Sequence, residues 1–275
     1  MRYKITLSYD GSAFCGWQIQ PNAPSVQQVL ENALSTLLRD KISVTGAGRT
    51  DTGVNAVGYV AHFDFTTDNQ SPLDCRQIGY KLNAILPTQI SVQEILPVDE
   101  DFHSRFSATR REYTYFLHRT KDPFADRFSY LCTYPLDIQA MNIAAEALLG
   151  THDFSCFEKS GGDNKTSICT VTEAFWHSYK PTHADLMGYR GAVARSGRPE
   201  DEPDYLYFRI SADRFLRNMV RAIVGTLIEV GRGKRSPEEF AALILPPGTT
   251  ASSPGRCAAG ESVPGHALFL SEVNY

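Results

Sequence analysis

Apolar residues alternate with polar ones, or run together, in seven short stretches of the chain, and each stretch predicts a strand. They cover residues 3–9, 57–65, 90–95, 110–118, 167–179, 205–211 and 266–275. Apolar residues three and four apart predict helices over residues 26–38, 73–86, 137–150 and 213–230, with a short helix after Ser236. The elements do not alternate strictly, so we expect an α+β fold of mainly antiparallel sheets flanked by helices.

Local signals support the helix ends. Ser25 with Gln28, and Ser236 with Glu239, have the spacing of a capping box, in which the serine hydroxyl accepts an unpaired backbone amide. Pro87 ends the second helix.

The element order predicts two similar lobes, residues 1–105 and 106–275, although no internal sequence repeat is visible. Residues 180–203 combine prolines, small residues and mixed charges. We expect them to form an exposed, mobile insertion between two strands, without chemistry of its own.

The composition is that of a soluble globular protein, with 42% apolar and 21% charged residues in a chain of 275. No apolar run approaches the roughly 18–20 residues of a membrane span, and the chain starts in a strand rather than a signal peptide. Six scattered cysteines without a C-x-x-C pair predict free thiols in a reducing cytoplasm. Seven histidines without ligand spacing predict no metal site.

The net charge is −4, but basic residues gather in two regions. Residues 209–235 hold seven arginines and lysines against two acids, and residues 101–121 hold five against two. This distribution predicts a groove for a polyanion. Arg214, Arg217 and Arg221 form a stripe on the expected helix. Such a stripe is usually a solvated face, yet arginine at all three positions favours contacts with phosphate.

The residues with the clearest chemistry lie between Gly46 and Ala56. Arg49 and Asp51 stand among three glycines before a predicted strand. A carboxylate kept ionised by a nearby cation is a candidate nucleophile. The alternative is a plain turn with a surface ion pair. A dinucleotide site fits poorly, because Asp51 stands where its third glycine would be, and no Gly-Lys-Ser/Thr of a P-loop occurs. Tyr113 could stack on a base or pack in the sheet, and the residues alone favour packing.

Seven segments, in order and over nearly the whole chain outside the insertion, resemble the tRNA pseudouridine synthase A family. They are residues 9–20, 25–31, 48–56, 102–108, 111–115, 215–221 and 268–275.

The resemblance implies the pseudouridine synthase fold and roles for four residues. Asp51 matches the nucleophile, and Arg49 the arginine that pairs with it and helps to displace the target base. Tyr113 matches a tyrosine that stacks on the uracil and takes part in moving the C5 proton, and Leu268 an apolar residue lining the pocket. The family isomerises uridines on the 3′ side of the tRNA anticodon stem-loop, at tRNA positions 38 to 40. It needs no metal or organic cofactor and works as a homodimer around a basic cleft.

Three positions depart from the family pattern. Asn55 stands where histidine is common, Tyr59 where glutamine is usual, and Ala267 where a glycine precedes Leu268. None touches the residues matched to catalysis, so we expect activity to survive.

Two rival hypotheses remain at the level of sequence. One is a noncatalytic tRNA-binding or folding-helper protein of the same fold, which the basic residues alone would support. The other is a carboxylate hydrolase or phosphotransferase using Asp10 or Asp51. It would need a second acid or a metal cluster, and the residues around Asp10 supply neither at a suitable spacing.

Overall fold

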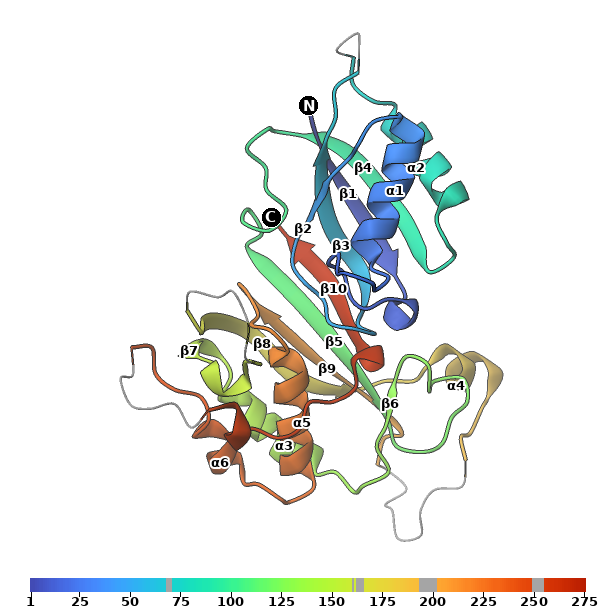
Figure 1. The fold of residues 1–275 in the computed structure, drawn as a ribbon. Helices are drawn as coiled ribbons and strands as arrows, with labels where there is room; N and C mark the ends of the chain where they lie inside the picture. The colour runs from blue at the N-terminus through green and yellow to red at the C-terminus, as the bar shows by residue number, and fades with distance from the viewer. Residues whose placement is uncertain (68–70, 160, 162–165, 193–201, 249–254) are drawn as a thin grey trace. The chain divides into compact units, whose positions relative to one another are not determined.

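The computed structural model describes residues 1–67, 71–159, 161, 166–192, 202–248 and 255–275. It divides into two compact units (Figure 1). Met1–Arg111 with Phe269–Tyr275 form the first unit, and Glu112–Leu268 form the second. Each unit is built on a mostly antiparallel sheet flanked by helices, which confirms the predicted α+β class. The units divide the chain after Arg111, and the C-terminal strand belongs with the first unit. Pairing between strands this far apart in sequence leaves no periodic signal.

The first unit contains a sheet in the order β4-β1-β3-β10, with β2 paired to β3. Its strands are β1 (Arg2–Tyr9), β2 (Val44–Gly46), β3 (Asn55–Asp64), β4 (Ile90–Val98) and β10 (Leu268–Asn274). These pairings are antiparallel, except that β10 runs parallel to β3. The register sets Ile5 opposite Ala61 on one side and Ile95 on the other. Every second residue of β1 is buried, as its alternation predicts.

Helices α1 (Val26–Leu38) and α2 (Cys75–Ile85) pack against each other on one side of this sheet (Figure 1). The Ser25 hydroxyl accepts the Gln28 amide at 3.3 Å, which confirms the expected start of α1. The second helix is slightly shorter than predicted, because the Asp74 carboxylate caps it by accepting the Gln77 amide.

The second unit contains a sheet in the order β5-β9-β8-β7, with β6 parallel to β5. Its strands are β5 (Arg110–His118), β6 (Tyr130–Leu131), β7 (Gly150–Asp153), β8 (Ile168–Ser178) and β9 (Tyr205–Ala212). Helix α3 (Ile138–Glu146) lies against β8, and α5 (Met219–Gly231) and α6 (Pro237–Ala241) pack on α3. Eleven of the thirteen α5 residues are buried, so this helix forms the centre of the unit's core.

Some boundaries differ from those predicted. The expected helix over residues 137–150 ends at Glu146, and Gly150 already begins β7. Strands β2 and β6 were not predicted, because two or three residues are too few to show a period.

The insertion predicted over residues 180–203 is exposed at its start, but it contains a helix that its composition did not indicate. Helix α4 (Thr182–Met187) forms there, and His183 Nε2 lies 2.7 Å from Asp122 Oδ2. The Asp122 side chain is completely buried and also accepts the Tyr205 hydroxyl at 2.7 Å. A buried carboxylate requires such partners, and one of them comes from the insertion. Residues 193–201 lie outside the described part of the chain.

Two further findings concern membrane spans and cysteine thiols. Among the described residues, no helix has both the length and the apolar character needed to cross a membrane. The thiols of Cys15, Cys75, Cys132 and Cys169 are free, as the sequence predicted.

Candidate active site

The loop between β2 and β3 carries both Arg49 and Asp51. It leaves the sheet at Gly46 and re-enters it at Asn55. Arg49 is exposed and Asp51 is half-buried, whereas Thr50 between them is buried. The loop therefore presents a cation and a carboxylate from a backbone that is anchored between them.

Aromatic side chains of neighbouring segments hold this backbone in place. The Tyr59 hydroxyl of β3 donates to the Gly48 carbonyl, and its ring stacks on Trp17 with centroids 4.0 Å apart. The Tyr9 hydroxyl lies 2.9 Å from Thr50 Oγ1 in a buried hydrogen bond. The Trp17 amide donates to the Thr50 carbonyl at 3.3 Å. The Gly48 carbonyl before Arg49 and the Thr50 carbonyl after it are therefore both held by hydrogen bonds.

Close backbone contacts with residues 11–16 complete the support. Gly16 has φ +96°, and a Cβ there would lie 2.3 Å from the Thr50 carbonyl oxygen. A Cβ on Gly11 would lie 2.2 Å from the Val54 carbonyl oxygen. Only glycine permits such approaches. Within the loop itself, by contrast, a Cβ on Gly48 would meet nothing within 4 Å. The loop therefore depends on two glycines outside it, Gly11 and Gly16, for its close backbone contacts.

Two of the positions expected to depart from the family pattern belong to this support. Asn55 is 1% exposed, and its Oδ1 accepts the Gly11 amide at 2.8 Å in a buried hydrogen bond. Tyr59 is completely buried and makes the bond to Gly48 described above. Sequence reasoning named both positions but assigned them no role, because a hydrogen bond to another segment, Gly11 for Asn55 and Gly48 for Tyr59, has no signature in the chain.

The other residues assigned to the site belong to the second unit. Tyr113 lies on β5, half-buried, and meets Phe215 edge-to-face with centroids 5.1 Å apart. Leu268 is 4% exposed at the start of β10. Tyr115, two residues along β5, is buried and donates to the Pro264 carbonyl at 3.2 Å, and burial raises the pKa of its phenol well above the ordinary value.

The expected arginine stripe is not a helix face. Helix α5 begins only at Met219, after Asn218 in a left-handed conformation (φ +64°), so Arg214 and Arg217 precede it. The backbone of this segment bonds elsewhere: the Arg217 carbonyl accepts the Lys159 amide at 3.0 Å. Apolar periodicity alone could not show that these residues bond to another part of the chain.

Arg221 is the one member of the predicted stripe that lies on α5. Its Nε donates to the Val263 carbonyl at 2.7 Å, and the Val263 amide donates to the Arg221 carbonyl at 3.2 Å. Arg221 thus anchors the chain just before Pro264.

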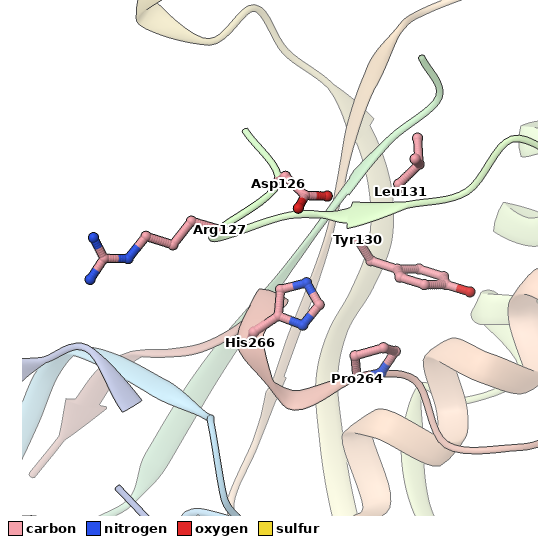
Figure 2. Close-up of a pocket in the computed structure, with 6 residues that line it drawn as sticks. All are labelled: Asp126, Arg127, Tyr130, Leu131, Pro264 and His266. Atoms are coloured by element: carbon pink, nitrogen blue, oxygen red, sulfur yellow. The ribbon is translucent and has the colours of Figure 1, made fainter. Parts of the chain in front are cut away.

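An open pocket of about 440 Å³ lies beside this anchored segment in the second unit (Figure 2). His266 and Tyr130 line it near Pro264, while the Arg127 side chain extends away. Asp126 and Leu131 complete the lining. Sequence reasoning named none of these residues, since they come from separate segments.

Comparison with known proteins decides the family. A family model described as tRNA pseudouridine synthase matches residues 5–107 and 144–275. The chain belongs to this family. It is 46% identical to tRNA pseudouridine synthase A of Bacteroides fragilis over 274 residues, which cover all of this chain and 96% of the relative. The Bacillus subtilis protein of the same name is 38% identical over 281 residues, covering all of this chain and 99% of the relative. This tRNA pseudouridine synthase is therefore an isomerase that converts uridine to pseudouridine.

Proposed function

We propose that this tRNA pseudouridine synthase modifies uridines of the anticodon stem-loop and uses Asp51 as its nucleophile. The observation that carries the proposal is the Arg49–Asp51 loop, in which a half-buried carboxylate follows a backbone held at Gly48 and Thr50. Catalytic groups are most effective when a rigid scaffold holds the loop that presents them.

The reaction exchanges one glycosidic bond for another. The N1–C1′ bond breaks and a C5–C1′ bond forms, while a proton leaves C5 and N1 gains one. The exchange is redox-neutral, and a temporary covalent bond to the enzyme divides it into easier steps. The Asp51 carboxylate can supply that bond by attack at either C1′ or C6. The uridine must also leave its stack, which costs a few kcal/mol, and Arg49 is the cation assigned to the vacated space.

The remaining roles rest on the family resemblance. Tyr113 is assigned to stack on the uracil and Leu268 to line its pocket. Arg214, Arg217 and Arg221 are assigned to phosphate contacts, which arginine suits because its planar group matches phosphate oxygens. Arg217 is exposed, whereas Arg221 is partly committed to the Val263 carbonyl.

The decisive experiment is pseudouridine mapping of an unmodified tRNA transcript incubated with Asp51→Asn. We expect no pseudouridine, with affinity for tRNA and the unfolding transition unchanged. Asp40→Asn, which removes an exposed carboxylate from the same unit, is the matched control and should be fully active. Product formed by Asp51→Asn would remove this residue from the mechanism. A wild-type protein that bound tRNA but changed no base would be a binding or folding-helper protein instead.

We propose in addition that the enzyme works as a homodimer, as the resemblance implies. Light scattering on the purified protein should give twice the mass of one chain, 30.5 kDa. A stable single-chain mass in the active enzyme would refute this.

A further inference from the structure

The turn formed by residues 103–107 presents an exposed aromatic ring. Phe106 is 76% exposed, although phenylalanine is usually buried. Its neighbour Arg105 is exposed too, with its guanidinium carbon 5.6 Å from the ring centroid. A single exposed ring needs no explanation by itself, so the structure beneath it decides its meaning.

The base of this turn is held by hydrogen bonds through Ser104, which is completely buried. The Ser104 hydroxyl donates to the Thr45 carbonyl at 2.7 Å, and its amide donates to His62 Nδ1 at 3.2 Å. Its carbonyl accepts the Tyr275 hydroxyl at 2.7 Å. All these partners lie in the first unit, so the turn has one fixed position on it.

The tip of the turn is ordered by His103. Its Nδ1 accepts the amides of Arg105 and Phe106 at 3.2 and 3.3 Å, and the Ser107 amide donates to its carbonyl at 2.9 Å. The His103 ring also lies against the Phe106 ring, with centroids 4.4 Å apart. Burial and the charge of Arg2 lower the pKa of His103, which keeps Nδ1 able to accept. Phe106 is therefore preorganised and would lose little side-chain freedom on binding a ligand.

The turn is also joined to the loop that carries Asp51. The Arg111 guanidinium donates to the Arg105 carbonyl at 2.6 Å and to the Ala47 carbonyl at 3.2 Å. Ala47 lies two residues before Arg49. One side chain thus ties the turn with Phe106 to the start of the nucleophile loop.

We infer that Phe106 is a stacking platform for an unpaired base of the tRNA, next to the nucleophile loop, with Arg105 contacting the adjoining phosphate. The inference rests on the proposed function for the identity of the RNA. A flat apolar ring can stack on any of the four nucleobases. The nearby guanidinium of Arg105 suits the negative charge of the adjoining phosphate. An extruded uridine leaves its neighbours unstacked, and these are the bases that such a platform would receive.

The test compares aromatic and aliphatic variants. Binding of an unmodified tRNA transcript is measured for Phe106→Ala, Phe106→Leu and Phe106→Trp. We expect alanine and leucine to weaken binding by about 5- to 150-fold, the range found for loss of one stacked base, and tryptophan to retain it. Tyr80→Ala is the matched control, because Tyr80 is also 76% exposed, lies in the same unit and should bind as the wild type does.

A second measurement reports stacking directly. Transcripts carrying single 2-aminopurine substitutions through the anticodon arm should include one whose fluorescence is quenched by the wild type and by Phe106→Trp but not by Phe106→Leu. Equal binding and equal quenching by wild type and Phe106→Leu would overturn the inference. The wild type's pseudouridine formation is measured in parallel. Its absence would refute the proposed function, while the binding comparison would still judge Phe106.

Discussion

Gly16→Ala tests whether the close backbone contact between Gly16 and Thr50 sets the position of the Asp51 carboxylate. The added Cβ would lie 2.3 Å from the Thr50 carbonyl oxygen, whereas ordinary contact begins near 3.4 Å and real Cβ atoms essentially never approach within 3.0 Å. The Cβ position is fixed by the backbone and the oxygen is a backbone atom, so no side-chain rotation can relieve the contact. The backbone at Gly16 or at Thr50 must therefore move by about 0.7 to 1.1 Å. Asp51 directly follows Thr50, so its position would change as well.

The displacement converts into two measurable losses. A misplacement of about 1 Å can cost about 100-fold in rate, so we expect single-turnover pseudouridine formation to fall by roughly that factor. An L side chain at φ +96° is strained by about 1–3 kcal/mol, and overpacking adds about 1–3 kcal/mol. Affinity for tRNA should change little, because the arginines assigned to phosphate contacts belong to the other unit.

Release of tritium from C5 of uridine-labelled tRNA measures the rate, and urea titration measures the fraction folded. Rates are corrected for that fraction, which separates lost geometry from lost folding. Two glycines with open space serve as controls. Gly48→Ala, in the loop itself, should leave the unfolding transition unchanged. Gly79→Ala, inside α2, should stabilise the protein by about 0.5–1 kcal/mol. A folded Gly16→Ala enzyme with wild-type turnover would refute the reasoning.

Four further predictions concern other contacts in the two units. Tyr59→Phe deletes only the hydroxyl that donates to Gly48. We expect the unfolding free energy to fall by about 0.5–1.5 kcal/mol and turnover to fall about tenfold, measured by urea titration and tritium release. Unchanged values would contradict this role of the hydroxyl. Burial lowers the pKa of His62 to about 4, so the unfolded chain binds more protons between pH 6.5 and pH 4 and stability falls as pH falls through that window; urea titrations across it should show a smaller fall for His62→Gln. Arg217→Ala should reduce the slope of log affinity against log salt by about 0.7–0.9 without altering stability. Arg221→Ala should instead destabilise the fold by about 1–3 kcal/mol, because the Val263 carbonyl loses its charged donor. A lower salt slope for Arg221→Ala together with lower stability for Arg217→Ala would contradict both assignments.

The arginines show why sequence reasoning fails where it does. Apolar spacing correctly located α5, but it extended the helix back over Arg214 and Arg217. Those residues precede a left-handed Asn218, and the Arg217 carbonyl accepts the amide of the distant Lys159. Periodicity reports only which face of a regular element is buried. It does not reveal where an irregular segment finds its hydrogen-bond partners.

The insertion shows a related limit. Its composition predicted an exposed segment, and it could not show that His183 of α4 meets the buried carboxylate of Asp122. The requirement to pair that carboxylate exists only once the chain has folded around it.

By itself, the sequence determined the α+β class, the main strands and helices, and the loop carrying Arg49 and Asp51, because period, capping residues and glycine spacing are local properties. Only the tertiary structure decided how that loop is held. The supports from Gly11, Gly16, Trp17, Asn55 and Tyr59 are contacts between separate segments, and so is the bond from Arg111, beside the turn with Phe106, to Ala47. Such contacts depend on strand register and close packing, which become defined only when distant parts of the chain meet.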